Sequence, residues 1–353
     1  MLGASIRELN QPVFVTGHTG FKGSWLSLLL RNLNINQFGF SLDPKINSLY
    51  ESAKLKSFVK CAVGDIRDYT LLSSTLNSIS PSVVIHLAAQ PLVIESYNDP
   101  LTTFQTNVIG TANLLQSVIE IRAVKVVLVI TTDKVYKNEN SGLRFKESDS
   151  LYGKDPYSAS KVAAENVCAA YRKISELTGG PKILVARAGN VIGGGDYAEN
   201  RLIPDIITSI QKKTELKIRN PHATRPWQHV LDPLIGYLKY IEYALVEETF
   251  PPALNFGPIE NSMSVSRVIE AAEEFHQQTL VTYPESKEVS VEAQLLELDS
   301  TLSQRTLDWQ PHWTQEQALT STFSWWKNVM SGESSALHEC QKDIEEILNA
   351  RST

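Results

Sequence analysis

Short apolar runs alternate with longer amphipathic stretches over residues 1–190. The apolar runs have the length of β-strands and lie at Pro12–Thr16, Gln37–Leu42, Val59–Val63, Val83–Leu87, Lys125–Ile130 and Lys182–Ala186. Helical periodicity is found at Ser24–Leu33, Tyr69–Ser78, Leu101–Ile121 and Pro156–Thr178. Strands that are apolar throughout and alternate with helices predict a parallel sheet covered on both faces. Right-handed crossovers make this a doubly wound, Rossmann-type α/β sheet.

After about residue 190 this rhythm breaks, and glycine and proline clusters separate shorter elements. Helices are expected at Leu202–Lys212, Leu234–Val246, Val265–His276 and Gln315–Val329. We predict a Rossmann-type domain over residues 1–190, with a later return of the chain near 230–258. A smaller, discontinuous mixed α/β substrate-binding domain is predicted over residues 191–353. The tail from Ser331 reads as a loop and a docking or dimer helix with Leu337, Cys340, Ile344 and Ile347 on one stripe.

Composition narrows the class of protein. The chain has 353 residues and is 42% hydrophobic, which excludes a disordered chain. Its net charge of −6 lacks the basic balance that is typical of a protein that binds nucleic acid. The three cysteines lie far apart, so neither disulfides nor a metal site are expected. Because no signal peptide or membrane-length apolar run is visible, we expect a soluble, cytoplasmic protein.

Three glycines, Gly17, Gly20 and Gly23, lie between the first strand and the first helix. In a dinucleotide site such glycines allow the tight turn, the approach of a pyrophosphate and close helix–strand packing. The spacing is GxxGxxG rather than GxGxxG, and a plain tight turn is the alternative. A nucleoside-triphosphate loop fits poorly because Lys22 precedes Gly23.

Further residues are predicted to complete the cofactor site. Asp43 follows the second strand, where an acid binds ribose hydroxyls and favours NAD over NADP, although a turn-forming Asp before Pro44 fits nearly as well. Charge from His18 and Lys22 in the loop leaves NADP possible. The complete expected set is Gly17, His18, Thr19, Gly20, Phe21, Lys22, Gly23, Asp43, Asp65, Ile66, Leu87, Ala88, Ala89, Asn107, Tyr157 and Lys161.

Tyr157 and Lys161 carry the sharpest chemical signal. Asp155 and Pro156 start a helix, so the two side chains lie four residues apart on one face. A neighbouring ammonium and a positively charged nicotinamide favour the phenolate and lower the phenol's pKa. The pair therefore suits removal of a proton from an alcohol while hydride leaves for NAD.

These motifs together resemble the extended short-chain dehydrogenases/reductases. The matching segments are TGHTGFKG, DIRD, HLAAQ, NVIGT and YSASK. The resemblance implies that Asn107 holds the helix geometry behind the site. It also implies that Thr132 hydrogen-bonds the substrate hydroxyl beside Tyr157.

Asp133 and Lys134 follow Thr132 at the carboxyl edge of the fifth strand. A simple epimerase needs no such acid/base pair, whereas elimination of water does. The layout resembles the 4,6-dehydratases of nucleotide sugars, although the dTDP-glucose branch has Thr-Asp-Glu. We expect Asp133 as acid and Lys134 as base, a role that Tyr157 or a water could share. A nucleotide-sugar 4-epimerase or a dehydratase of another nucleotide hexose is the alternative.

Several segments resemble the CDP-glucose branch of these dehydratases, including HLAAQPLV, NPHATRPWQHVLDPLIGYL and ARAGNVIGGGDYAENRLIPD. The resemblance implies CDP-glucose as substrate, Asn190, Arg201 and Arg225 at its diphosphate, and a homodimer or dimer of dimers through Leu101–Ile121 and Pro156–Thr178. Gln90 and His229 lie in the same segments and are expected to bind substrate. Glu292–Leu298 could line the base pocket.

Overall fold

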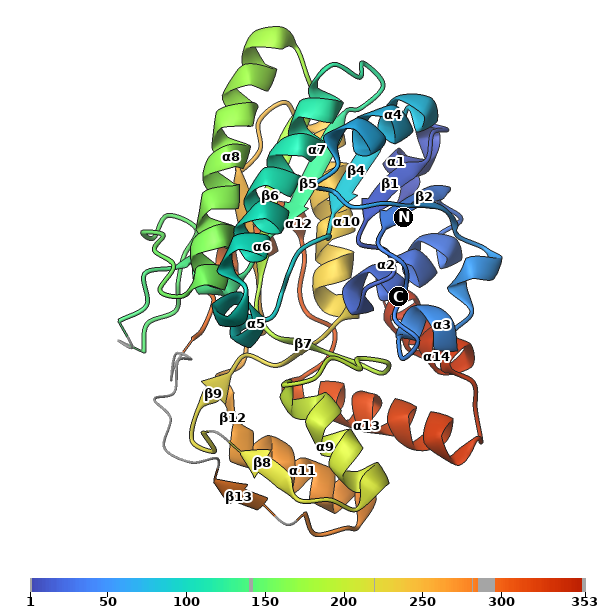
Figure 1. Cartoon of the computed structure of the whole chain (residues 1–353), viewed down its shortest axis with the longest axis vertical. Coiled ribbons are helices and arrows are strands. Elements are labelled where there is room, and N and C mark those ends of the chain that lie inside the picture. The colour runs from blue at the N-terminus through green and yellow to red at the C-terminus, as the bar shows by residue number, and fades with distance from the viewer. Residues whose placement is uncertain (1, 140–141, 219, 281, 285–295, 351–353) are drawn as a thin grey trace.

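The computed structural model describes residues 2–139, 142–218, 220–280, 282–284 and 296–350, and its centre is a parallel β-sheet (Figure 1). The seven strands, in their order across the sheet, are β11 (Ala253–Phe256), β6 (Lys182–Ala188), β5 (Val126–Ile130), β4 (Val83–His86), β1 (Val13–Thr16), β2 (Gln37–Ser41) and β3 (Lys60–Val63). Val13 pairs with Gln37 on one side and Val83 on the other. The strand order reverses between β1 and β4, so ligands are expected at the carboxyl ends there.

Helices cover both faces of the sheet. One face carries α4 (Tyr69–Ile79), α6 (Pro100–Phe104), η2 (Gln105–Ile109), α7 (Gly110–Ile119) and α8 (Pro156–Thr178). The other carries α1 (Ala4–Glu8), α2 (Phe21–Asn32) and α10 (Leu231–Val246). Alternate strand residues enter the two cores: Val126 and Leu128 pack on one side, Val127 and Val129 on the other. Burial on both faces explains why the strands are apolar throughout.

The predicted elements of the sheet region are largely confirmed, with small shifts at their ends. The helix predicted over Leu101–Ile121 is instead three segments, α6, η2 and α7, in which η2 is a π-helical turn. Helix α8 has the bounds predicted, because Asp155 accepts a hydrogen bond from Ser158 N at 2.9 Å and Gly179 ends the helix with φ 69°. The chain returns to this sheet at α10 and β11, where β11 pairs in parallel with β6.

A second group of elements lies below the carboxyl edge of the sheet in Figure 1. Its helices are α9 (Leu202–Lys212), α11 (Val265–His276), α13 (Gln315–Ser331) and α14 (Ala336–Asn349). Its strands form the pairs β7 (Val191–Ile192) with β10 (Gln228–His229), β9 (Thr224–Arg225) with β12 (Met263–Ser264), and β8 (Leu216–Ile218) with β13 (Thr282–Pro284). These strands are too short to show a pattern in the sequence.

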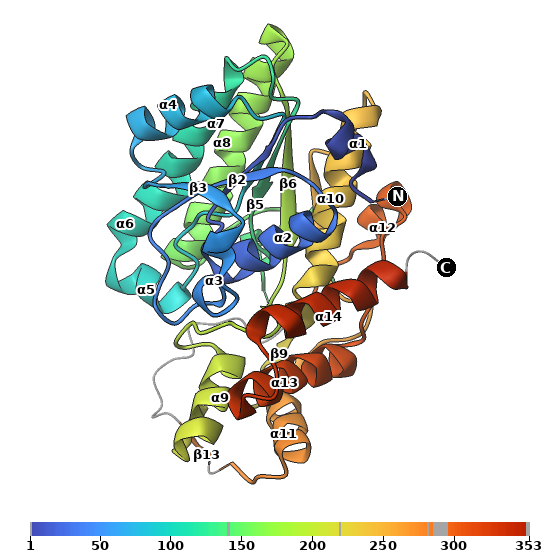
Figure 2. The same cartoon turned by 90° about the vertical axis from the view of Figure 1, so that its right-hand side faces the viewer.

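The remaining elements are short connections: α3 (Leu49–Ser52), η1 (Leu55–Ser57), α5 (Val93–Asn98), η3 (Asp133–Val135) and α12 (Thr301–Leu307). The tail helix α14 packs beside α13 and against α2 and α3, as Figure 2 shows. Cys340, Ile344 and Ile347 on its predicted stripe are fully buried. The stripe therefore docks α14 on the body of the same chain.

Candidate active site

The glycine turn joins β1 to α2 with almost no space for side chains. Gly17 has φ 74°, and a Cβ there would lie 2.6 Å from Ala88 N. A Cβ on Gly23 would lie 2.1 Å from Gly17 O. Gly20 is the residue before α2 and its side-chain position is comparatively open. The first and third glycines thus pack the turn, and the first-turn N–H groups of α2 are available to an anion at the carboxyl edge.

The other residues of the turn have distinct surroundings. Thr19 Oγ1 is 2.6 Å from Ser41 Oγ and fastens the turn to the end of β2. His18 is buried against Tyr50, and burial lowers its pKa to about 4. The imidazole is therefore neutral near pH 7, and the expected positive charge at His18 is wrong. Phe21 packs on the core formed by α2 and α10.

Lys22 is the cation of this turn. Its Nζ donates to Tyr237 Oη at 3.3 Å. Burial, and then the positive charges of Arg201 and Lys161, lower its pKa to about 7, while Asp133 acts in the opposite direction. The first turn of α2 therefore faces the same space as the predicted catalytic residues.

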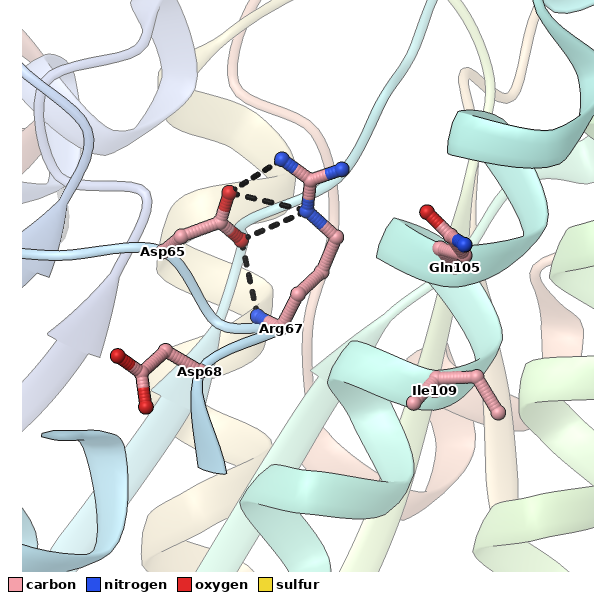
Figure 3. A pocket seen from close by; sticks show the side chains of 5 residues that line it. All are labelled: Asp65, Arg67, Asp68, Gln105 and Ile109. Carbon is pink, nitrogen blue, oxygen red and sulfur yellow. Dashed lines mark hydrogen bonds and ion pairs between the residues drawn. The ribbon is translucent and has the colours of Figure 1, made fainter. Parts of the chain in front are cut away.

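The far end of the crevice holds the predicted nucleoside residues. Asp43 is exposed just beyond β2. Asp65 lines an open pocket of about 570 Å³ with Arg67, Asp68, Gln105 and Ile109 (Figure 3). Arg67 holds both carboxylate oxygens of Asp65, with Nη2 2.6 Å from Oδ2, and its hydrogen bonds lower the pKa of that carboxyl.

Ile66 does not line this pocket. It is 4% exposed and belongs to the core under α7, where a Cβ on Gly110 would lie 2.5 Å from Ile66 Cδ1. Leu87, Ala88 and Ala89 follow β4, with Leu87 N donating to Thr16 O at 3.1 Å. Ala88 thus forms the wall against which Gly17 packs.

Tyr157 and Lys161 lie buried in the first two turns of α8. Lys161 Nζ donates to Ile130 O at 3.1 Å, and burial lowers its pKa to about 8, so the ammonium persists at neutral pH. Burial raises the pKa of Tyr157 to about 12, against a hydrogen bond with Thr132 that favours the phenolate. The expected lowering is therefore not present in the protein alone and requires a bound cation near the phenol.

Asp133 lies beside this pair in the turn after β5. Its Oδ1 accepts from Thr132 Oγ1 at 3.0 Å, while its buried Oδ2 has no hydrogen-bond partner among the residues that the structure describes. Burial raises the pKa of this carboxyl, opposed by the charges of Lys134 and Arg225. Gly189 keeps the space around Oδ2 free, since a Cβ there would lie 2.9 Å away. Asp133 thus has the surroundings of a proton donor.

Asn107 lies in the π-turn η2 and joins two segments of the site. Its side chain accepts from Gln90 N at 2.8 Å and donates to Ser160 Oγ at 2.8 Å. The side chain of Gln90 makes its hydrogen bonds within its own loop and to Thr103. A π-turn at such a position is typical of functional sites. These hydrogen bonds connect η2 to the Gln90 loop and to α8, and the role that the resemblance implies for Asn107 stays a prediction.

The predicted substrate residues separate into two groups. Arg225 is buried and its charge acts on Asp133, and Arg201 acts on Tyr157 while pairing with Asp196 at 3.0 Å. Asn190 lies just before β7, where its carbonyl accepts from Gln228 N at 3.3 Å. The charges of Arg225 and Arg201 therefore act on Asp133 and Tyr157, two of the predicted catalytic residues.

His229 is in the other group, and its expected contact with substrate is wrong. The ring is fully buried, 4.3 Å from the Trp313 ring and 5.6 Å from that of Trp25. Its Nε2 lies 3.4 Å from Asp343 Oδ2 on α14. The motif containing His229 is therefore partly structural, since this side chain packs between two tryptophans and lies next to the tail helix.

The segment proposed for the base pocket lies mostly outside the described residues, at 292–295. Within its described part, Leu296 and Leu298 pack with Val135, Tyr136 and Phe145 beneath the catalytic turn. Glu297 pairs with Arg144 at 3.1 Å. The two leucines therefore point into a core and not into a ligand pocket.

Sequence reasoning missed a buried ion pair next to the site, between Glu165 and Arg187. The available signal was position: Glu165 follows Lys161 by four residues on the same helix face. In the described ranges no cluster of His, Cys, Asp and Glu could hold a metal ion. None of the helices described combines the length and apolar character needed to cross a membrane.

Comparison with known proteins places this geometry in a family. The family model described as GDP-mannose 4,6 dehydratase matches residues 14–322. CDP-glucose 4,6-dehydratase from Salmonella typhimurium is 38% identical over 347 residues, 96% of this chain and 96% of that protein.

Solved structures share the fold. A dTDP-glucose 4,6-dehydratase from Bacillus anthracis in complex with NAD has a TM-score of 0.75 at 24% identity, covering 90% of this chain and 97% of that one. A UDP-glucose 4-epimerase from Thermotoga maritima has a TM-score of 0.79 at 21% identity, covering 91% and 100%. The chain belongs to the GDP-mannose 4,6-dehydratase family, within the extended short-chain dehydrogenase/reductase fold.

Proposed function

We propose that the protein is a hydro-lyase that converts CDP-D-glucose to CDP-4-dehydro-6-deoxy-D-glucose. The observation that carries this proposal is Asp133, a buried carboxyl with a free oxygen beside Thr132 and Tyr157. Oxidation alone has no use for such an acid, whereas elimination of water does. The similarity to the Salmonella enzyme over 96% of the chain supports CDP-glucose as the substrate.

The crevice at β1, β2 and β4 fits NAD. The turn at Gly17 and Gly23 leaves room only for backbone, and the start of α2 offers N–H groups to a pyrophosphate. Asp43, exposed after β2, is positioned for the ribose hydroxyls, where a carboxylate disfavours the 2′-phosphate of NADP. When bound, NAD accepts a hydride from the sugar and returns it later in the same turnover.

Tyr157 and Lys161 on α8 are proposed to carry out the oxidation at C4. Tyr157 removes the proton of the C4 hydroxyl while the C4 hydride departs, and Thr132 shares a hydrogen bond with the same phenol. Lys161 stays protonated at neutral pH and stabilises the phenolate electrostatically. The resulting C4 ketone acidifies the proton on C5.

Elimination follows at C5 and C6. Lys134, half-buried next to Asp133, removes the C5 proton when it is in its uncharged amine form, and Asp133 gives its proton to the C6 hydroxyl, which leaves as water. The C5–C6 double bond would then accept at C6 the hydride that a bound NAD supplies, and Lys134 returns its proton to C5. One water is lost overall, and transfer of the proton held by Tyr157 back to Asp133 restores both residues.

Arg201 and Arg225 are proposed to hold the diphosphate, because one guanidinium group can donate two parallel hydrogen bonds to the oxygens of a phosphate. Asn190, just before β7, is proposed to join them at the diphosphate. The positive charges of Arg201 and Arg225 would attract an anionic substrate to a protein with a net charge of −6.

The protein is further proposed to act as a homodimer in the cytoplasm. Leu101 and Ile109, on adjoining α6 and η2, are 68% and 53% exposed beside α8. Exposed apolar side chains gathered on neighbouring helices are typical of an interface. The three cysteines are all free, which fits a reducing compartment.

The test is incubation with CDP-, dTDP-, UDP- and GDP-glucose, followed by mass analysis of the nucleotide-sugar product. Loss of one water from CDP-glucose, with the alkaline absorbance of a 4-ketosugar, is the expected result. A product of unchanged mass and altered configuration would identify a 4-epimerase instead. Preferential dehydration of another nucleotide hexose would correct the base specificity alone.

A further inference from the structure

A buried ion pair connects α8 to β6 immediately behind the catalytic residues. Arg187 on β6 holds both oxygens of Glu165, with Nη2 2.5 Å from Oε2 and Nε 2.9 Å from Oε1. Both side chains are 6% exposed. Glu165 lies on the face of α8 that also carries Tyr157 and Lys161, eight and four residues earlier.

The same pair reaches the segment that enters the catalytic turn. Thr131 Oγ1 donates to Glu165 Oε1 at 2.7 Å. One residue earlier, Ile130 O accepts from Lys161 Nζ at 3.1 Å. The end of β5 is therefore tied to α8 at two successive residues.

It also reaches the segment that leaves the turn. Arg187 Nη1 donates to Tyr136 Oη at 2.8 Å, and that hydroxyl donates to Asn255 Oδ1 on β11 at 2.7 Å. Arg187 Nη1 further donates to Glu147 O at 3.2 Å. Tyr136 is 1% exposed, so the packing around its phenol holds the side chain in place.

From these contacts we infer that Glu165 and Arg187 are positioning residues that hold the turn Asp133–Lys134 at both ends. The helix that carries Tyr157 and Lys161 thereby sets where the elimination residues lie. The inference rests on the proposed function, because only a dehydratase needs both groups in one register. The hydrogen bonds given for Glu165 and Arg187 go to residues on either side of Asp133 and Lys134 and not to Asp133 or Tyr157, so each acts through the turn.

A consequence distinguishes positioning from general support of the fold. Loosening the turn misplaces Asp133 and Lys134, while Tyr157 and Lys161 remain on α8. Elimination should slow more than C4 oxidation, and a displacement of about 1 Å costs roughly 100-fold in rate. Substrate affinity should change little, because the proposed phosphate ligands lie on other segments.

The experiment uses Glu165→Gln and Tyr136→Phe, assayed with CDP-glucose deuterated at C4 or at C5. The second variant removes one hydroxyl and leaves the ion pair, so it keeps the test decisive where Glu165→Gln does not fold. We expect kcat to fall about 10- to 100-fold with little change in KM. The isotope effect on kcat should shrink for C4 deuterium and grow for C5 deuterium.

Arg172→Lys is the matched control. Arg172 also joins α8 to β6 and the start of β11, through Ile183 O at 2.9 Å and Pro252 O at 3.0 Å, but at the opposite edge of the sheet. The Arg172→Lys variant should have a lower Tm than the wild-type protein and the same pattern of isotope effects.

Two outcomes distinguish failure of the proposed function from failure of the positioning inference. If the wild-type protein releases no water from any nucleotide hexose, the proposed function is wrong. If the wild-type protein dehydrates its substrate but the folded variants keep wild-type isotope effects, or slow both steps equally, positioning by Glu165 and Arg187 is overturned.

Discussion

At the residue scale, the proposed chemistry depends on a phenol whose pKa the protein alone does not lower. Burial raises the pKa of Tyr157 to about 12. A positively charged nicotinamide nearby favours the phenolate, so loading with NAD should lower this pKa. Spectroscopic titration of the phenolate, in free and NAD-loaded protein and with Tyr157→Phe to assign the signal, should show the shift. An unchanged titration on loading would remove the argument for Tyr157 as the base.

The same residue provides a kinetic prediction. Tyr157→Phe keeps the aromatic ring and removes only the hydroxyl that is proposed to take the C4 proton. Turnover should fall about 10²- to 10⁴-fold, as expected for loss of an acid/base group. In stopped flow, no reduced nicotinamide should form on mixing with CDP-glucose. Turnover at the wild-type rate would show that another residue starts the reaction.

Asp133 links function to stability. Its pKa is raised in the folded protein, so the folded state holds the proton more tightly than the unfolded chain, whose value is near 3.8. Stability is thus lost as pH rises from about 3.8 through the folded pKa. Asp133→Asn removes this loss, and its Tm relative to wild type should rise over that pH range. It should also retain C4 oxidation but not elimination, so reduced cofactor accumulates.

A flat Tm difference between pH 4 and pH 8 would argue that Asp133 is not destabilised by burial. Asp43→Asn is the control, since Asp43 is exposed and its substitution should give no such trend. Stability gained at the cost of activity is the usual sign of a group held in a poor environment for its chemistry.

At the element scale, the junction of β1 and α2 depends on Gly23. An added Cβ would meet the Gly17 carbonyl at 2.1 Å, and backbone cannot yield as a side-chain end can. Gly23→Ala should therefore cost about 1–3 kcal/mol and weaken NAD binding, measured by thermal unfolding and calorimetry. Gly179→Ala is the control: that position has φ 69° but open space, so it should cost stability without weakening NAD binding. Equal NAD affinity in Gly23→Ala would count against the turn as the pyrophosphate site.

The elements also show how far a sequence can predict this molecule. Strands buried on both faces and capped helices such as α8 have strong local signals, and these predictions were confirmed. The π-turn at Gln105–Ile109 has the same apolar periodicity as an α-helix, so one continuous helix was expected there. It places Asn107 between Gln90 and Ser160, contacts that only the folded chain brings together.

The direction in which a side chain points is the other feature that the sequence does not predict. His229 shares a motif with Arg225, yet its ring is packed between tryptophans while the charge of Arg225 acts on Asp133. Nothing local distinguishes these orientations, because they depend on α14, more than 100 residues later. Arg187 was missed for the same reason: its partners are on α8 and after β5.

At the scale of the whole molecule, the two regions are joined by close packing. Trp25 Nε1 on α2 donates to Gly194 O at 3.0 Å, and a Cβ on Gly194 would lie 1.9 Å from the Trp325 ring. The tail helix α14 bridges α13 and α2 (Figure 2). The helix that begins the proposed pyrophosphate site is thus braced from the substrate side, which keeps both halves of the crevice in register.

The exposed apolar surface of α6 and η2 leads to the last prediction. Leu101 and Ile109 lie on segments that adjoin α8, and a stable dimer covers about 800 Å² on each partner. The wild-type protein should sediment as a dimer, and the double substitution Leu101→Glu with Ile109→Glu should sediment as a monomer, because paired carboxylates oppose apolar burial. Val246→Glu, at the end of α10 on the other face of the sheet, replaces a side chain that is 69% exposed and should leave the dimer intact. A monomeric wild-type protein, or a double variant that stays dimeric, would show that α6 and η2 do not form the interface.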